Sequence, residues 1–415
     1  MTYELRPYQA AAVERAVAYL TDPRKKGRNG IVVVPTGGGK SLVLAGIVKG
    51  LGGPCIVLQP SKEILEQNAQ KLVGYGYKPA IFSASTGRHE IGDLTLGTIG
   101  TVANQATAFR AFPYVLIDEC HHLVNPRGGM YARFLAAIDG ARICGTTATP
   151  YRLHSNSFGS ILRFLTRTRP RIFHDVIFAA QVGDLLRAGY LAPVEYRQRA
   201  VIRRERLRLN STGADYTDQS VQQHFREVGF AGRLQVEVVR LLVEGRRNIV
   251  VFTRFVEESE QLARAIPGAA VVTAETPARE RERILEDFRA GRIRVVSNVG
   301  IIALGFDFPA LETVVLARPT LSLAVFYQQI GRAIRPHPDK ARAVVLDLVG
   351  LVQQFGRVED LVLRPGGKTG EQWVVTSNGR PLTNCYFGEQ DSRRKYWAER
   401  NSAARCHVAD AGKVM

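Results

Sequence analysis

The sequence has few cysteines and no long apolar run, and both absences narrow the classes of protein that it could encode. The five cysteines are scattered along 415 residues without a Cys-x-x-Cys pair, so neither a disulfide framework nor a zinc ribbon is predicted. No apolar stretch approaches the roughly 20 residues that span a bilayer. Residues 1–20 carry charges among their hydrophobic positions, which is unlike an export signal. We therefore expect a cytoplasmic protein without membrane contact.

Acidic residues are also in short supply. The chain has 38 Asp and Glu against 56 Lys and Arg, a net charge of +18. Residues 151–210 alone hold twelve arginines and four acidic residues. Such an excess predicts a polyanionic partner, most simply nucleic acid. Two other interpretations remain open: arginine-rich genomic base composition, and a solvated strand face over residues 197–208.

Short apolar runs alternate with helical segments through most of the chain. We predict strands over residues 31–34, 55–58, 114–117 and 142–145, and again over 248–252, 294–298, 313–317 and 343–347. This alternation is typical of parallel sheets covered by helices on both faces. The predicted architecture is α/β, with two similar domains at 1–165 and 233–350. A basic linker or insertion would occupy 166–232, and a C-terminal extension of unknown role 351–415.

Residues 34–41 (VPTGGGKS) follow the first predicted strand directly and open a helix. Glycines let backbone N–H groups surround a polyphosphate, the lysine can reach the β- and γ-phosphates, and the serine hydroxyl can bind Mg²⁺. The P-loop pattern G-x-x-x-x-G-K-[ST] has glycine where this chain has Val34. A simple glycine turn between strand and helix is the alternative.

The predicted strand 114–117 ends in two adjacent carboxylates, Asp118 and Glu119. Carboxylates at the end of a strand beside a phosphate loop can hold Mg²⁺ through water and orient the attacking water. The following Cys120, His121 and His122 invite a zinc interpretation, which we disfavour because residues adjacent in a strand alternate faces.

A third pattern, residues 328–335 (QQIGRAIR), holds Arg332 and Arg335 three positions apart, so we expect them on one face of a helical turn. Two such arginines can serve as fingers on a γ-phosphate. An exposed basic helix end is the alternative.

The order of short motifs resembles a superfamily 2 helicase of the DEAD/DEAH-box type. The motifs are residues 5–9 (LRPYQ), 35–41, 59–61 (QPS), 118–121 (DECH), 146–150 (TTATP), 251–253 (VFT), 298–309 and 328–335. Residues 149–152 (TPYR), 276–281 (TPARER) and 318–320 (RPT) look more particularly like the bacterial RadD-type repair helicases and their phage relatives.

This resemblance implies two RecA-like domains of a P-loop NTPase that uses ATP and Mg²⁺. The nucleotide-binding positions would be Arg6, Gln9, Thr36, Gly37, Gly38, Gly39, Lys40, Ser41, Gly305, Asp307 and Gln328. The catalytic positions would be Lys40, Asp118, Glu119, Arg332 and Arg335, with Ser41 and Asp118 on Mg²⁺. Coupling of hydrolysis to movement would involve His121, Thr147 and Thr149, and contacts to a nucleic-acid strand Ser61, Thr101 and Arg254.

Two departures from the family pattern bear on function. Ala303 and Leu304 stand where relatives often have threonines, which puts the coupling in question. RadD-type members also continue into a cysteine-rich zinc module, whereas the tail here has only Cys385 and Cys406 with His407, half of a degenerate metal site at most. We expect no structural metal. Basic and aromatic residues at 393–397 could bind nucleic acid or belong to an amphipathic helix.

The sequence thus predicts an ATP-dependent motor on nucleic acid, with single-stranded or branched DNA favoured and a role in repair, recombination or replication, together with a single-strand-binding or repair partner protein. Three alternatives stay open: translocation on duplex without strand separation, action on RNA, and a binding module whose ATPase has decayed.

Overall fold

The computed structural model describes residues 4–123, 128–138, 140–156, 159–300, 308–366, 372–384 and 386–387. They form two compact units. Unit 1 comprises Met1–Arg152, Arg163–Gln181 and Leu363–Val374, and unit 2 comprises Leu153–Leu162, Val182–Val362 and Val375–Met415. In the described part of the chain, no helix is long and apolar enough to cross a membrane.

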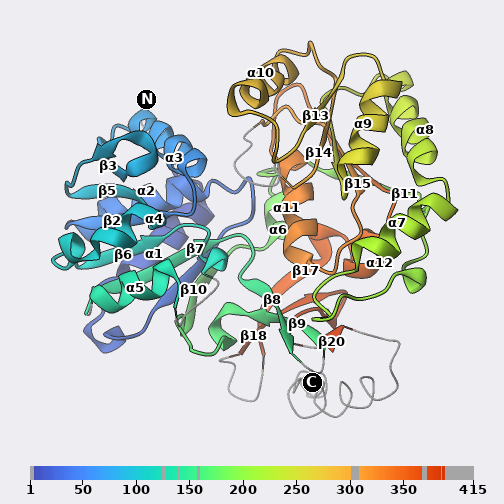
Figure 1. The fold of residues 1–415 in the computed structure, drawn as a ribbon. Helices are drawn as coiled ribbons and strands as arrows, with labels where there is room; N and C mark the ends of the chain where they lie inside the picture. Colours follow the sequence, from blue (N-terminus) through green and yellow to red (C-terminus); the bar gives the residue numbers. More distant parts are fainter. Residues whose placement is uncertain are drawn as a thin grey trace. The chain divides into compact units, whose positions relative to one another are not determined.

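Unit 1 is built on an eight-stranded sheet that is parallel apart from its β3–β4 edge (Figure 1). Its spatial order is β10 (Asp175–Ala179), β1 (Gly30–Val33), β7 (Arg142–Thr147), β6 (Tyr114–Ile117), β2 (Cys55–Gln59), β5 (Leu94–Thr98), β3 (Ala80–Ser83) and β4 (Arg88–His89). The helices are α1 (Pro7–Thr21), α2 (Lys40–Leu51), α3 (Lys62–Gly74), α4 (Ile99–Val102) and α5 (Met130–Ala137).

Successive side chains of the central strands enter two separate apolar cores. Ile31 and Val33 pack on one face with the phenylalanines of the α4–α5 region, whereas Val32 and Val34 pack on the other with α1 and α2. Burial on both faces explains why these strands read as continuous apolar runs rather than alternating ones. The four strands predicted in this half are present, each within two residues of its predicted bounds.

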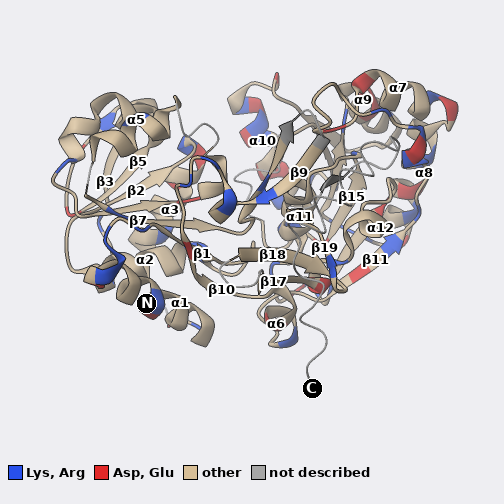
Figure 2. Ribbon diagram, turned by 90° about the horizontal axis from the view of Figure 1, so that it is seen from below, with Lys and Arg blue, Asp and Glu red and all other residues tan. Residues whose placement is uncertain are grey.

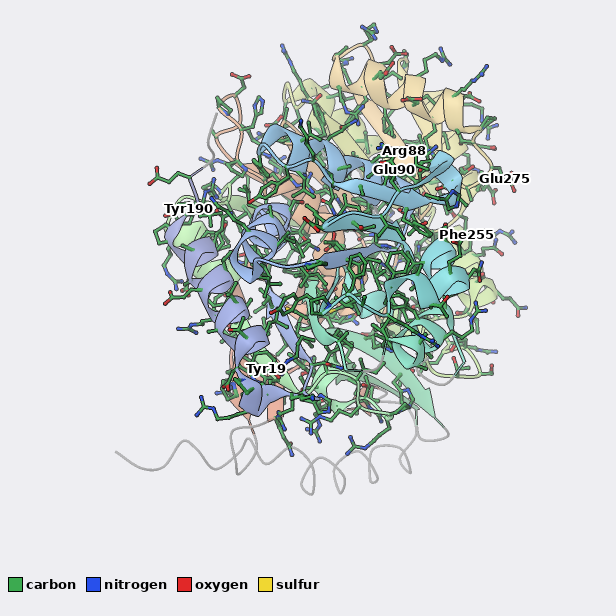
Figure 3. All side chains as sticks on the ribbon, turned by 90° about the vertical axis from the view of Figure 1, so that its left-hand side faces the viewer. Tyr19, Arg88, Glu90, Tyr190, Phe255 and Glu275 are labelled. Atoms are coloured by element: carbon green, nitrogen blue, oxygen red, sulfur yellow. The ribbon has the colours of Figure 1, made fainter. Side chains whose placement is uncertain are left out.

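The first helix is fastened to the edge strand β10 across a long sequence separation. The Tyr19 hydroxyl (labelled in Figure 3) donates to Asp175 Oδ2 at 2.7 Å, and the Arg28 guanidinium donates to the same carboxylate. Burial raises the pKa of Asp175, but its bonds to Arg28 and Tyr19 outweigh burial and lower the pKa to about 2. Asp175 therefore stays ionised and holds α1 against the sheet.

Unit 2 is built on a six-stranded, fully parallel sheet in the order β11 (Val194–Gln198), β16 (Ala343–Asp347), β15 (Thr313–Ala317), β12 (Ile249–Thr253), β14 (Val295–Asn298) and β13 (Ala269–Val272). Its helices are α6 (Val182–Arg187), α7 (Asp218–Glu227), α8 (Phe230–Val243), α9 (Val256–Ala265), α10 (Ala278–Arg289), α11 (Leu323–Ala333) and α12 (Leu351–Phe355). The four strands predicted for this half are all present.

Two three-stranded sheets complete the described structure. They are β17 (Leu361–Gly366), β18 (Gln372–Ser377) and β19 (Arg380–Pro381), and β20 (Tyr386–Phe387), β9 (Gly159–Phe164) and β8 (Tyr151–Asn156). The region 351–415, predicted as an extension without apolar periodicity, thus supplies strands up to residue 387. Cys385, Cys406, His407 and residues 393–397 lie outside the described residues.

The predicted linker 166–232 is not a separate segment in the structure. Its first part supplies β10, the edge strand of the unit 1 sheet, and its later part supplies β11, the edge strand of the unit 2 sheet, followed by α7 and the start of α8. The difference has a physical cause. Edge strands are half exposed and carry charge, and β10 and β11 contain mostly partly exposed residues, so neither stands out as a buried run.

Several arginines of the basic stretch are paired within their own unit. Arg197 on β11 contacts Glu195 and Glu244, and Arg199 lies 3.6 Å from Glu237. Figure 2 shows acidic residues interspersed with Lys and Arg along the helices of unit 2. Part of the local positive charge therefore serves the fold.

Gly145 on β7 should tolerate no side chain. A Cβ there would lie 2.7 Å from Cys120 Sγ and 2.8 Å from Phe173, and overpacking of this kind costs about 1–3 kcal/mol. We expect Gly145→Ala to lower the free energy of unfolding of unit 1 by about that amount in chemical denaturation.

The matched control is Gly232→Ala on α8, where a Cβ meets nothing within 4 Å. Because alanine has the higher helix propensity, this change should be neutral or stabilising by about 0.5–1 kcal/mol. Equal effects of the two substitutions would contradict the packing described for β7.

Candidate active site

The glycine turn of residues 35–39 connects β1 to α2, as predicted. Gly37 and Gly39 have φ of 83° and 77°, a backbone region that residues with side chains rarely adopt. The Gly38 N–H donates to Pro35 O at 2.9 Å and closes the turn. Val34, which replaces the glycine of the P-loop pattern, is fully buried and donates its N–H to Thr147 O at 3.1 Å. The turn therefore begins after Val34, and the position of Val34 itself does not require glycine.

Gln9, one of the predicted nucleotide-binding residues, packs directly against this turn. It is 2% exposed, and its Nε2 donates to Gly38 O at 2.9 Å while its Oε1 accepts from the Arg6 N–H at 2.9 Å. The Tyr8 hydroxyl donates to the same carbonyl at 2.6 Å. A Cβ on Gly39 would come within 2.3 Å of Gln9 Nε2. The start of α1 and the glycine turn are thus one packed assembly.

The two carboxylates follow β6 and face different partners. Asp118 is 3% exposed; its Oδ1 accepts from Thr146 Oγ1 at 3.0 Å, and its Oδ2 accepts from Asn68 Nδ2 at 2.9 Å. Glu119 has φ 47° and ψ 47°, which is unfavourable for a residue with a side chain. Such strain persists only when surrounding contacts impose it, and for Glu119 these contacts include Lys40.

Lys40, the first residue of α2, forms the central ion pair. Its Nζ contacts Glu119 Oε1 and lies 3.6 Å from Asp118 Oδ1. Burial lowers the pKa of Lys40, but the two carboxylates outweigh burial and the net shift is upward. Burial would likewise raise the pKa of Glu119, yet Lys40 and His121 hold it below its ordinary range. Both groups are therefore charged at neutral pH.

Asn68 forms hydrogen bonds with both Ser41 and Asp118, the two residues predicted to hold magnesium. The sequence analysis did not identify Asn68 as a site residue. Its Oδ1 accepts from Ser41 Oγ at 2.6 Å and its Nδ2 donates to Asp118. Asn68 lies with Leu65 and Leu72 on the buried face of α3. A polar residue inside an apolar helical stripe was the available signal.

The coupling candidates form a chain from Glu119 into β7. His121 Nδ1 lies 3.3 Å from Glu119 Oε2 and 2.9 Å from Thr147 Oγ1, which in turn accepts from the Thr149 N–H at 3.0 Å. The segment Cys120–His122 is a short 3₁₀ helix, so the assumption of a strand here was wrong. Among the described residues, no group of three or more His, Cys, Asp or Glu could hold a metal ion.

The three residues predicted to contact a nucleic-acid strand have different surroundings in the structure. Ser61 caps α3, its Oγ accepting from the Ile64 N–H at 3.4 Å, and Thr101 Oγ1 accepts from the Ala84 N–H at 2.9 Å. Arg254 is used inside unit 2: it pairs with Asp218 at 2.8 Å and donates to Tyr216 O at 2.6 Å, and its side chain is 9% exposed. Its contact with a strand stays a prediction without support from this geometry.

The finger candidates lie at the end of α11. Gln328 and Arg332 are on the helix, but the helix ends at Ala333, so Arg335 lies beyond it rather than on the same helical face. Pro336 explains this end, because the residue before proline disfavours helical backbone. The buried Lys340 Nζ secures the segment by donating to Ala333 O at 2.7 Å and Leu311 O at 2.9 Å.

The remaining predicted residues are of two kinds. Ala303, Leu304, Gly305 and Asp307 are outside the described residues, and Thr36 is half-buried in the glycine turn.

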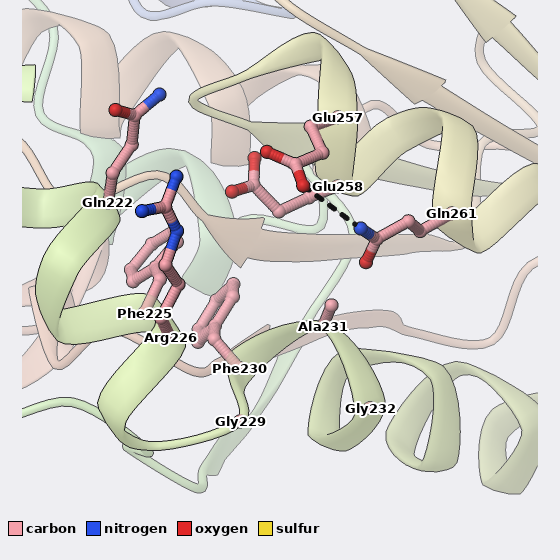
Figure 4. Close-up of a pocket in the computed structure, with 10 residues that line it drawn as sticks. All are labelled: Gln222, Phe225, Arg226, Gly229, Phe230, Ala231, Gly232, Glu257, Glu258 and Gln261. Atoms are coloured by element: carbon pink, nitrogen blue, oxygen red, sulfur yellow. Dashed lines mark hydrogen bonds between the residues drawn. The ribbon is translucent and has the colours of Figure 1, made fainter.

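Unit 2 also has a hollow between α7, α8 and α9, lined by Phe225, Arg226, Phe230, Glu257 and Glu258, among others (Figure 4). The Gln261 amide donates to Glu257 at 3.2 Å on its rim. Burial raises the pKa of Glu258 to about 7. None of the predicted site residues lines it.

Family comparisons agree with this arrangement. Residues 2–152 match the family model described as "Type III restriction enzyme, res subunit", and residues 234–337 match "Helicase conserved C-terminal domain". The chain therefore contains two RecA-like helicase domains, which is consistent with a superfamily 2 helicase. The narrower resemblance to RadD-type helicases is not confirmed by these matches and stays a prediction.

The individual relatives described next are 25–28% identical to this chain. A "51.5 kDa protein" of a Lactococcus phage is 28% identical over 322 residues, 76% of this chain and 64% of the relative. The "DNA 3'-5' translocase XPB2" of Sulfurisphaera tokodaii is 25% identical over 378 residues, 81% of this chain and 80% of the relative. The first two curated relatives are longer proteins, of which the chain spans 64% and 53%.

Among solved structures, the chain is similar to an ATP-dependent Type ISP restriction-modification enzyme, LlaBIII, bound to DNA. The TM-score is 0.60 at 18% identity, covering 84% of this chain and 28% of the other. The likeness at this identity concerns the fold, and it agrees with the two parallel sheets described above.

The Lys40–Glu119 pair should stabilise unit 1 measurably. Lys40→Met would leave a largely buried carboxylate without its partner, so we expect a loss of about 1–3 kcal/mol, and Lys40→Met/Glu119→Gln should recover much of it. A double-mutant cycle in urea checks this. Additive effects would contradict the pair.

The same pair fixes the sign of a pH effect. Because the pKa of Glu119 is lowered in the folded state, its contribution is fully present above the ordinary value near 4.5 and is lost as pH falls through the folded value. The coupling free energy of the cycle should therefore decline only in acid, below about pH 4.5. A decline between pH 6 and 8 would point to another group.

Proposed function

We propose that this chain is an ATP-driven motor that couples hydrolysis to movement along DNA. The observation that carries the proposal is the assembly of Lys40, Ser41, Asp118 and Glu119 at the glycine turn of unit 1. Phosphate-binding backbone, a cation for the phosphates, oxygen donors for Mg²⁺ and a carboxylate for water meet at the carboxyl ends of β1 and β6, where α/β sheets place their ligands.

The ion pair suggests how nucleotide binding prepares the site. ATP phosphates would compete with Glu119 for the Lys40 ammonium, because they carry more negative charge. Once Lys40 turns to the phosphates, the depressed pKa of Glu119 would rise toward its ordinary range, and the carboxylate would become a better acceptor for a water proton. Until ATP binds, Glu119 would thus remain paired with Lys40.

Magnesium fits the donors that the structure presents. Ser41 supplies a hydroxyl oxygen and Asp118 a carboxylate, the hard oxygen ligands that this ion prefers, with waters and phosphates as the rest of its shell. When bound, Mg²⁺ would neutralise charge on the β- and γ-phosphates. Ser41 and Asp118 would hold it, and Asp118 would do so through water.

In the proposal, Arg332 and Arg335 of unit 2 stabilise the charge that develops on the transferring phosphoryl group. Such fingers are worth about 10³–10⁵ in turnover. Gln328, Gly305 and Asp307 would contribute to the same nucleotide, and His121, Thr147 and Thr149 would transmit hydrolysis to the strand-binding surface, with Ser61 and Thr101 contacting the phosphate backbone.

DNA is the proposed track, with single-stranded or branched DNA favoured. Relatives named as DNA 3'-5' helicases and translocases support it, as does the net charge of +18. Repair is the proposed setting, and a single-strand-binding or repair protein the proposed partner. The name of the S. tokodaii relative, a translocase, favours a second candidate, movement on duplex without strand separation.

ATP hydrolysis should depend on Lys40, on Glu119 and on a polymer. We expect DNA to stimulate steady-state hydrolysis of Mg·ATP, and expect Lys40→Ala and Glu119→Gln each to reduce turnover by about 10²–10⁴. The measurement compares single-stranded, duplex and forked DNA with RNA. Turnover near wild type in both variants would overturn the site assignment. Stimulation by RNA alone would contradict the proposal that the motor moves on DNA.

Strand separation and translocation can be told apart with two substrates. A motor that unwinds should release a labelled strand from forked DNA, whereas a motor that only translocates on duplex should displace a third strand from a triplex and leave the fork intact. Because phosphate contacts release counterions, binding should weaken steeply between 50 and 200 mM salt. DNA binding without displacement on either substrate would leave no role for the motor.

A further inference from the structure

Asn68 occupies an unusual place for an uncharged polar side chain. It is 6% exposed, on the face of α3 that packs on the unit 1 sheet. Both ends of its amide are in use: Oδ1 accepts from Ser41 Oγ at 2.6 Å, and Nδ2 donates to Asp118 Oδ2 at 2.9 Å and to Gln59 Oε1 at 3.2 Å. A side chain from α3 thus connects the first turn of α2 to the end of β6.

The acceptors around Asn68 fix which way its amide points. A flipped amide would place its oxygen against the Asp118 carboxylate, which is an acceptor, and would lose that hydrogen bond. The oxygen therefore has to face Ser41. The fully buried Gln59 on β2 accepts from the same Nδ2.

The orientation determines where the Ser41 proton goes. A serine hydroxyl has one hydrogen and two lone pairs, and it can bind a cation only through the lone pairs. With its proton committed to Asn68 Oδ1, Ser41 Oγ presents lone pairs on the remaining side. Asp118 accepts an N–H bond from the same amide through Oδ2, which leaves Oδ1 on its other side.

We propose that Asn68 is a positioning residue that orients Ser41 and Asp118 toward Mg²⁺ at the phosphates of the nucleotide. The proposal rests on the proposed function, because it concerns the same site. Residues that orient metal ligands without touching the metal typically contribute 10–100-fold to its affinity. If the role of Asn68 were purely structural, its substitution would lower the free energy of unfolding. The dependence of nucleotide binding on Mg²⁺ would then stay unchanged.

The test is the equilibrium binding of a fluorescent, non-hydrolysable ATP analogue to the full chain, titrated with Mg²⁺ and repeated in EDTA. We expect Asn68→Leu, close in volume, and Asn68→Ala to raise the half-saturating Mg²⁺ about tenfold or more, with less than a twofold change in EDTA. The control is Gln70→Ala, an exposed residue of the same helix, which should match wild type.

A double-mutant cycle identifies the route of the effect. If Asn68 acts through Ser41, Ser41→Ala and Asn68→Leu should be strongly non-additive in Mg²⁺ dependence. Thermal unfolding of each variant shows whether it folds. Should the Asn68 variants fail to fold, Gln59→Leu removes one acceptor that orients the amide and should raise the half-saturating Mg²⁺ by a smaller factor, about twofold to threefold.

The outcomes separate the two proposals. Wild-type protein that binds Mg²⁺-nucleotide while all Asn68 and Gln59 variants keep its Mg²⁺ dependence would overturn the role of Asn68 alone. Additive effects in the cycle would do the same. Wild-type protein that binds no nucleotide in the presence of Mg²⁺ would overturn the proposed function and the role of Asn68 together.

Discussion

The structure of unit 1 depends on the burial of its central parallel strands on both faces. Because β1, β2, β6 and β7 run in the same direction and are covered by helices, their carboxyl ends meet along one edge of the sheet. Every chemically active group described for this unit follows one of those ends or faces it from a helix. Apolar packing therefore decides where the polar groups gather, and the hydrogen bonds among them refine an arrangement that the core has already imposed.

Several polar groups at that edge are hydrogen-bonded or ion-paired to one another. Lys40 compensates Glu119, Asn68 compensates Ser41 and Asp118, and Gln9 occupies the carbonyl of Gly38. A buried polar group without a partner costs free energy, so these contacts stabilise this edge of the sheet. In the proposed function, nucleotide binding would exchange some of these partners for phosphate groups.

The sequence was sufficient for the buried strands and the glycine turn, and insufficient where burial is partial. Strands such as β6 and β12 are continuous apolar runs, and their bounds were predicted closely. The edge strands β10 and β11 carry no such run, and both lie in the segment that was expected to be a linker. Within the site, local spacing was enough to predict that Lys40, Asp118 and Glu119 lie together. The partners of Asn68 lie 27 and 50 positions away along the chain, so its only local signal was a polar residue on an apolar helical face. The end of α11 before Arg335 followed from Pro336, a local signal that the prediction of a shared helical face overlooked.

The charged edge of unit 2 has a consequence beyond stability. β11 exposes one side of its backbone at the margin of a parallel sheet, and such a margin can recruit a strand from another molecule. Arg197 on this strand and Arg199 just after it form ion pairs with Glu195, Glu244 and Glu237. A second chain approaching to extend the sheet would have to desolvate or break these pairs. The paired charges at Arg197 and Arg199 therefore oppose the addition of a further strand at this edge, as charges on edge strands do in general.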